Sequence, residues 1–372
     1  MPKIREIFQR HQDEYMARYE ETMPPWHRQA LHDVTACRTQ AMGGHVQECG
    51  DCGHREYVYH SCRSRACPAC HSGETAAWLA ARAAELLPVR YFHVVFTVPE
   101  ALREPLRRNQ TALCGALMRA AAEAVSVLAA DPKYLGGVPG ILAVLHTWGR
   151  TLVWHPHVHC LVTAGGVAAN NHTWLEAPNP AFLVPVQALG AVFRGRFAAL
   201  ARAAAPDLPL PGEVFTPGVR WVVHAKPCLA GAAQVVDYLG RYIHRLPVSD
   251  ARILTATDTA VTFRYRDTAT GKNRAMTLSP MEFIRRCLQH VPPTGFHRIR
   301  YYGLWSPACR GRLRRAMLML AAVRATLAAA ISIVAEFAQA AHQAVAVCRC
   351  PRCQSRNVRA IAWFRPGEHG PP

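Results

Sequence analysis

The sequence predicts an α+β protein with a cysteine-rich, zinc-binding N-terminal part and an α-helical C-terminal tail. Two Cys-x-x-Cys pairs in the first quarter of the chain are typical of a structural zinc site. Runs of β-branched and aromatic residues have the length of strands, and alanine-rich stretches favour helices. Because 372 residues are many for one core, we expect three parts, at 1–88, 89–303 and 304–372.

The charge of the chain favours a nucleic-acid partner. Lys and Arg number 43 against 25 Asp and Glu, which gives a formal net charge of +18. Most of these cations are Arg, whose planar guanidinium suits phosphate. An anionic membrane surface would also attract such a chain. However, the apolar run at 316–335 carries Arg324 in its middle and much alanine, so we interpret it as a packed helix and expect no membrane partner.

The 14 cysteines are predicted to bind metal rather than to form disulfides. The first residues contain no apolar signal-peptide core, so we expect a reducing, cytoplasmic location. Two Cys-x-x-Cys turns can close one tetrahedral zinc site. The expected ligands are Cys49, Cys52, Cys67 and Cys70, with Cys62 as the alternative. The terminal knuckle, Cys348-Arg-Cys350-Pro-Arg-Cys353, has no evident partner. A second zinc site closed by Cys348 and a distant residue such as Cys309 is an open alternative.

Basic and aromatic residues surround the first two turns. Tyr57 and Tyr59 alternate beside Arg55, Arg63 and Arg65, a combination that suits a nucleic-acid surface. A solvated basic rim is the simpler interpretation for any single Arg. A second basic-aromatic segment, at 297–303, predicts contacts to phosphate or bases by Arg298 and Arg300.

Local patterns predict the remaining elements in order. Helices are expected at 74–87, 105–130, 186–204 and 231–246, and again from Pro280 onward. Strands are expected at 91–98, 140–148, 154–162, 220–225 and 297–303, with two or three short strands within 252–278.

The predicted strand at 154–162 carries alternating histidines. Side chains alternate across a strand, so His157 and His159 share one face while Val158 faces the other. His155 has the same parity, but Pro156 favours a strand start or edge, so His155 is treated as a neighbour. Histidines that only hydrogen-bond to backbone are the simpler alternative.

A hairpin would supply a third imidazole. Gly149-Arg150 is the expected turn between the strands at 140–148 and 154–162, which would place His146 beside His157 or His159. Three imidazoles from one hairpin would make a divalent-metal site with open positions.

The predicted helix at 231–246 carries a tyrosine pair with cations. Tyr238 and Tyr242 are four residues apart and share a helix face, and Arg241 and Arg245 lie within one turn of them. Arg245 is a further predicted DNA contact. Such a stripe is more often core than catalytic when it stands alone. Beside a metal site, it predicts phosphoryl transfer from single-stranded DNA to a tyrosine, which gives a 5′-phosphotyrosine and a free 3′-hydroxyl.

These motifs resemble a known family. His157-Val-His159 resembles the His-hydrophobe-His motif of HUH single-strand endonucleases, and Tyr238-Leu-Gly-Arg-Tyr242 resembles their two-tyrosine motif. Further segments occur in the same order as in the zinc-bearing rolling-circle transposases of bacterial insertion sequences, the IS91 family, at 43–53, 61–70, 93–99, 145–149, 155–160 and 300–303. The resemblance covers about residues 37–303.

The resemblance implies an HUH-like catalytic domain of antiparallel sheet with flanking helices. It implies a catalytic Mg²⁺ or Mn²⁺, structural Zn²⁺, and single-stranded DNA at transposon ends and target DNA as partners, with host replication factors as further candidates. Tyr238 and Tyr242 would act in successive strand transfers. Ala66 stands where the family usually has His, and Arg241 stands where related initiators carry Lys, so Arg241 is assigned electrostatic help rather than proton donation.

Three rival functions remain at this point. A metallo-hydrolase using His155, His157 and His159 would usually add an Asp-His pair soon after, and Cys160-Leu-Val-Thr follows instead. A non-catalytic zinc-dependent DNA-binding protein would leave the histidine and tyrosine pairs unexplained. A plasmid replication initiator or relaxase would use the same chemistry in another setting.

Overall fold

The computed structural model describes residues 3–64, 66–68, 70, 72–228, 240, 247–267, 270–321 and 349–368. Two predicted regions fall largely outside this part of the chain. They are the tyrosine helix at 231–246, of which Gly240 alone is described, and most of the apolar run at 316–335.

The largest sheet is antiparallel, which confirms the predicted class. Its strands run in the order β11-β4-β5-β3-β7, and β6 pairs with β5. The two longest strands, β4 and β5, form the predicted hairpin. The strands are β3 (Tyr91–Thr97), β4 (Gly137–Trp148), β5 (Trp154–Ala168), β6 (Trp174–Glu176), β7 (Val222–Pro227) and β11 (Ile299–Gly303).

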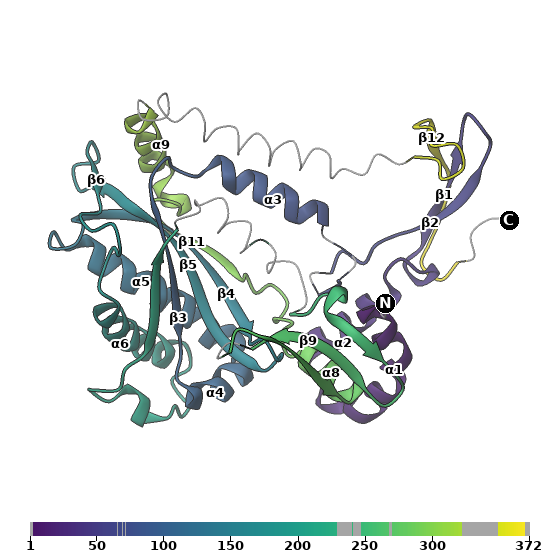
Figure 1. The fold of residues 1–372 in the computed structure, drawn as a ribbon, viewed down its shortest axis with the longest axis horizontal. Coiled ribbons are helices and arrows are strands. Elements are labelled where there is room, and N and C mark those ends of the chain that lie inside the picture. Colours follow the sequence, from purple (N-terminus) through teal and green to yellow (C-terminus); the bar gives the residue numbers. More distant parts are fainter. Residues whose placement is uncertain are drawn as a thin grey trace.

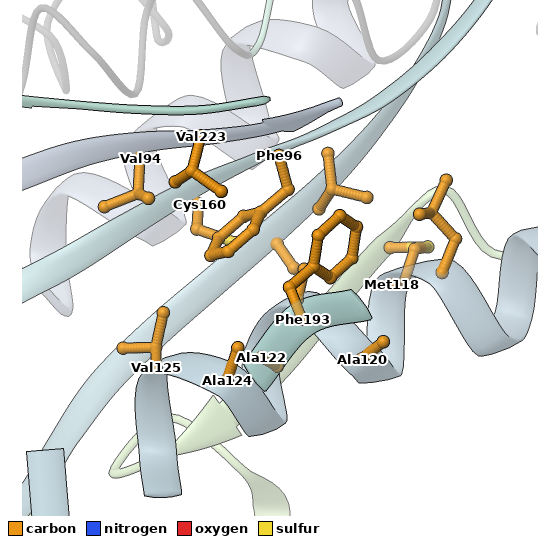
Figure 2. Packing of buried hydrophobic residues seen from close by; sticks show 14 of the residues in the cluster. Val94, Phe96, Met118, Ala120, Ala122, Ala124, Val125, Cys160, Phe193 and Val223 are labelled. Atoms are coloured by element: carbon orange, nitrogen blue, oxygen red, sulfur yellow. The ribbon is translucent and has the colours of Figure 1, made fainter. Parts of the chain in front are cut away.

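One face of this sheet packs on two helices, α5 (Gly115–Ala130) and α6 (Val186–Ala204) (Figure 1). Alternate residues of β3 and β5 point into this core, and Figure 2 shows Phe96 and Phe193 in contact range there, with ring centroids 4.9 Å apart. Alanines on α5 allow the helix to approach the sheet closely. Preceding it along the chain are α4 (Arg103–Arg108) and the π-helical turn η4 (Gln110–Cys114).

Among the described residues, the helical stretch Gln110–Ala130 is long and apolar enough to cross a membrane by length and composition alone. Leu117, Ala121 and Val125 of this stretch are buried in the core against the sheet. Its apolar character therefore has a packing explanation.

The opposite face of the sheet is covered by α3 (Ser72–Ala84). Trp78 and Leu79 of α3 pack against a small cluster made of Tyr91, Leu142, Val144 and Leu161. This face also carries the histidines of β4 and β5, because paired residues of neighbouring strands lie on the same side.

A second core joins the N-terminal part of the chain to the later segments of the predicted catalytic region. Helices α1 and α2 pack with α8 and a three-stranded sheet of order β10-β9-β8. Ser279 caps α8 by accepting the Glu282 N–H at 3.3 Å, and Pro280 occupies its first turn. Packing therefore crosses the predicted boundary at residue 88. The elements are α1 (Ile4–Tyr19), α2 (Pro25–Ala36), β8 (Ile253–Ala256), β9 (Val261–Arg266), β10 (Asn273–Leu278) and α8 (Pro280–Leu288).

A third, smaller sheet lies at one end of the molecule (Figure 1). It has the order β12-β1-β2, with β1 (Gly44–Cys49), β2 (Arg55–Tyr59) and β12 (Val358–Phe364). The tail was predicted to be helical. It does begin with α9 (Arg310–Met319), but it also contributes β12 to the N-terminal part. Short 3₁₀ turns are η1 (Glu20–Thr22), η2 (Gln40–Met42), η3 (Glu100–Leu102), η5 (Gly212–Phe215), η6 (Asp250–Arg252) and η7 (Pro307–Cys309).

Candidate active site and metal centres

The β4–β5 hairpin brings three histidines together, as its register predicts. His146 lies directly opposite His157, and His159 lies opposite Val144, one step further along the same face. One ring nitrogen from each histidine lies within 4.8 Å of the other two. The structure therefore places His146 beside His157 and His159, and their role as metal ligands stays a prediction.

Hydrogen bonding orients the central histidine. Nδ1 of His157 lies 2.7 Å from the carbonyl oxygen of His155. A carbonyl can only accept, so Nδ1 carries the proton and Nε2 keeps its lone pair for a ligand. His155 thus contributes a carbonyl, and its own ring is not part of the three-histidine group.

The structure adds a fourth histidine that the sequence reasoning did not assign. His93 of β3 places Nε2 2.8 Å from Nδ1 of His159, and the two rings stack with centroids 5.0 Å apart. If Nε2 of His159 bound a metal, its Nδ1–H would donate to His93, an arrangement that fixes ring orientation at metal sites. The parity of β3 was the available signal, because Thr97 pairs with His157 and His93 lies four residues earlier on that face.

Burial keeps the three histidines neutral. Desolvation, with repulsion from the neighbouring imidazoles, lowers the pKa of His146 and of His159 well below the ordinary 6.5. Burial also lowers the pKa of His157 to about 4. At neutral pH all three therefore offer lone pairs rather than positive charge. Trp148 stacks on His146 at a centroid distance of 5.1 Å and closes one side of the group.

The donor set fits a divalent transition metal. Imidazole nitrogens suit Zn²⁺ and Fe²⁺ best. Mn²⁺, a first-row transition ion, accepts them more readily than Mg²⁺, which prefers oxygen ligands and keeps several waters. Within the described residues, this group contains no carboxylate. The residues present therefore fit Mn²⁺ more closely than Mg²⁺.

The predicted DNA-binding arginines differ in exposure. Arg298 is only 8 % exposed, donates to the His290 carbonyl, and lies 5.8 Å from the Trp148 ring centre, so its predicted contact with DNA does not fit its burial. Arg300 is half-buried over Phe296, whereas Arg63 is exposed. Arg65 and Arg245 lie outside the described residues.

The predicted nucleophiles Tyr238 and Tyr242, with Arg241, also lie outside the described residues. Gly240, between them in the chain, is described and buried. A Cβ built on Gly240 would lie 2.5 Å from Cδ2 of Leu79, so this glycine packs directly on α3.

The cysteines form two groups, which corrects the predicted single site. Cys49 and Cys52 do not join Cys67 and Cys70. The first group contains Cys37, Cys62, Cys67 and Cys70, and the second contains Cys49, Cys52, Cys350 and Cys353. In each group the four sulfur atoms lie within 4.8 Å of one another. The proposed alternative Cys62 is a member of the first group, while Cys309 belongs to neither.

The first group is built into the helical core. Cys37 follows α2, and its Sγ lies 3.2 Å from Sγ of Cys70, which lies 3.7 Å from Sγ of Cys62. Cys37 and Cys67 are fully buried among Leu31 and Val34. Every Cys-x-x-Cys turn offers the same two thiolates, so the sequence could not decide which turns meet.

The fold and these clusters define a basic α+β protein with separate imidazole and thiolate centres. Residues 7–98 match the family described as transposase zinc-binding domain, and residues 140–312 match the family described as "Putative transposase". The chain is therefore a member of the IS91 family of insertion-sequence transposases, as its motifs predicted, and it carries the zinc-binding domain of that family.

Two relatives support this assignment. The chain is 43 % identical over 319 residues to "Putative transposase y4qJ" of Sinorhizobium fredii, which covers 81 % of this chain and 80 % of the relative. It is 33 % identical over 292 residues to "Transposase for insertion sequence element IS801" of Pseudomonas savastanoi pv. phaseolicola, which covers 73 % of this chain and 68 % of the relative. No solved structure matches the chain. Family membership indicates an enzyme that cleaves DNA and transfers strands.

Proposed function

We propose that this transposase nicks and rejoins single-stranded DNA at the ends of its element through a 5′-phosphotyrosine intermediate. The carrying observation is the group of His146, His157 and His159, three neutral imidazoles on one sheet face with nitrogens within 4.8 Å. A divalent ion bound there would polarise the scissile phosphate and offset the charge that builds in the transition state.

The chain's own residues supply the nucleophile and its activation. The phenolate oxygen of Tyr238 or Tyr242 attacks phosphorus, the bond from phosphorus to the 3′ oxygen breaks, and the leaving 3′ oxygen takes up a proton. The tyrosine then holds the 5′ phosphate. Tyrosine has an ordinary pKa of about 10, so a nearby cation such as Arg241 favours the phenolate. Rejoining reverses these steps with the 3′-hydroxyl of another strand and needs no nucleotide hydrolysis.

Packing of Gly240 supports bringing the tyrosine segment to the histidine face. Gly240 lies between the two tyrosines in sequence and is buried against Leu79. Leu79 packs in the cluster that contains Val144, the partner of His159 in the β4–β5 ladder. On the same face, Lys226 of β7 is paired with His93 and is exposed, so it offers a further cation for a phosphate.

The test uses purified protein, Mn²⁺ and an end-labelled single-stranded oligonucleotide from the element end. We expect a covalent adduct at the 5′ phosphate of the fragment that lies 3′ of the nick, and a free 3′-hydroxyl on the other fragment. His157→Ala should abolish the adduct. Tyr238→Phe and Tyr242→Phe should each reduce it and the double change should remove it, whereas Tyr265→Phe on β9 is the matched control.

Two results would contradict the proposal. An adduct of unaltered yield in the double tyrosine variant would remove both nucleophile assignments. Retained DNA binding without cleavage, at any Mn²⁺ or Mg²⁺ concentration, would favour a non-catalytic DNA-binding protein.

A further inference from the structure

We propose that the two ends of the chain share a second zinc ion. Its ligands would be Cys49 and Cys52 from the N-terminal part and Cys350 and Cys353 from the C-terminal part. The zinc-binding family match ends at residue 98, so half of this ligand set lies outside it. The proposal is independent of the nicking chemistry.

Sulfur distances fit a tetrahedral ion rather than disulfides. Sγ of Cys49 lies 3.5 Å from Sγ of Cys353, and Sγ of Cys52 lies 3.6 Å from Sγ of Cys350. A disulfide would require about 2.05 Å. Four thiolates at the usual Zn–S distance of about 2.3 Å stand roughly 3.8 Å apart, close to the observed separations.

The two turns have matching backbone geometry. In the first, the Gly53 N–H donates to the Cys49 carbonyl at 2.9 Å, and the Cys49 N–H donates to the His54 carbonyl at 2.9 Å. In the second, the Gln354 N–H donates to the Cys350 carbonyl at 2.8 Å, and the Cys350 N–H donates to the Ser355 carbonyl at 2.8 Å.

The residue after each second cysteine is left-handed in both turns. The φ angle is +67° at Gly53 and +61° at Gln354. Glycine adopts this region freely, whereas glutamine does so at a cost, which the closed turn must offset. Two turns with the same hydrogen bonds and the same left-handed residue face each other as two equivalent halves of one thiolate site.

Glycines of the N-terminal part leave room for the C-terminal segment. A Cβ on Gly44 would lie 2.6 Å from Cζ of Phe364, and a Cβ on Gly50 would lie 2.5 Å from Nδ2 of Asn357. The Gly50 N–H also donates to the Asn357 carbonyl at 2.8 Å. Asp51 accepts hydrogen bonds from the side chains of Asn357 and Ser355.

The small sheet needs a cross-link between its N-terminal and C-terminal strands to be stable. Among the side chains of its three strands, the buried apolar ones are Val46, Cys49 and Phe364. So few buried groups cannot offset the entropy of ordering three strands. β1 lies between β12 and β2. Loss of the shared zinc ion would therefore release β12 and expose one edge of β1. A zinc ion shared by the two ends would supply the missing stability.

Metal content of the full chain tests the proposal. We expect two cysteine-bound zinc ions per purified protein and one in Cys350→Ser. Cys49→Ser should also retain one, and the double variant should still retain one, because both residues bind the same ion. Cys309→Ser, outside both groups, is the matched control and should retain two. A double variant that loses both ions, or Cys350→Ser that keeps two, would overturn the shared site.

A second measurement needs no substitution. In the unaltered zinc-loaded protein, Cys49, Cys52, Cys350 and Cys353 should resist alkylation by N-ethylmaleimide together and become reactive together as a chelator is added. Mass spectrometry of the peptides reports each thiol. Alkylation of Cys350 and Cys353 while Cys49 and Cys52 remain protected would contradict the proposal even if every variant failed to fold.

Discussion

The histidine centre and the cysteine centres are assembled over very different distances along the chain. His146 and His157 face each other across a hairpin, and the third histidine follows two residues later. In the cysteine groups, Cys37 meets Cys70 and Cys49 meets Cys353. The residues of a site built on one hairpin can be predicted from strand parity. Those of a site built from chemically equivalent turns can be assigned only from the tertiary structure.

The two cysteine groups also differ in their surroundings. The group around Cys67 is embedded in the core formed by α1, α2 and α8. The group around Cys350 lies at the end of β1, in a small sheet at one end of the molecule. Loss of metal should therefore have a global effect in the first group and a local effect in the second.

The largest expected effect is that of Cys67→Ser. Cys67 is fully buried in the helical core, and structural zinc contributes on the order of 10 kcal/mol to small zinc-binding folds. We expect the free energy of unfolding to fall by at least about 5 kcal/mol, as measured by denaturant titration. Cys350→Ser should leave the main transition nearly in place. Equal losses in the two variants would abolish the contrast between the groups.

The next largest effect is expected for His159→Ala in β5, on metal affinity and DNA cleavage. Removing one of three imidazoles should lower Mn²⁺ affinity and single-strand cleavage by at least about 100-fold, because the remaining two hold the ion weakly. Calorimetric Mn²⁺ titration and a nicking assay measure this change. Zinc content should not change. The exposed His172→Ala is the control, and an unaltered Mn²⁺ affinity in His159→Ala would remove His159 from the site.

A smaller effect is expected from His93→Ala. His93 contacts His159 at 2.8 Å and would orient it, and losing such a partner typically costs about 10- to 100-fold in metal affinity. His93→Gln keeps a hydrogen-bonding group and should recover part of the loss. Mn²⁺ titration of both variants is the measurement. Identical affinities for wild type and His93→Ala would show that the contact does not position the ligand.

The effect that is smallest at neutral pH concerns His290, a buried histidine outside the three-histidine group. His290 donates to the Leu152 carbonyl, and burial lowers its pKa from 6.5 to about 3. Between these values the unfolded chain binds a proton that the folded chain does not. The free energy of unfolding should therefore fall as pH falls through this window, by up to about 1.4 kcal/mol per pH unit. His290→Gln should have a shallower pH dependence, and an unchanged slope would contradict this assignment.

The α+β class, the main strands and the histidine centre could all be derived from local sequence patterns. Strand period and hairpin pairing act over a few residues. Parity therefore put His157 and His159 on one face, and the hairpin turn brought His146 to them. The sequence also identified cysteines as the metal-binding residue type, and its ordered motifs identified the family.

Contacts between groups that are distant along the chain could be assigned only from the three-dimensional structure. It paired the N-terminal turn with Cys350 and Cys353, added His93 to the histidine centre, buried Arg298 and turned the end of the tail into β12. These outcomes depend on packing between segments up to about three hundred residues apart, where the entropy of closing the intervening chain changes little with its length. Local patterns carry no information about such pairings, because each Cys-x-x-Cys turn and each strand edge is chemically able to accept several partners.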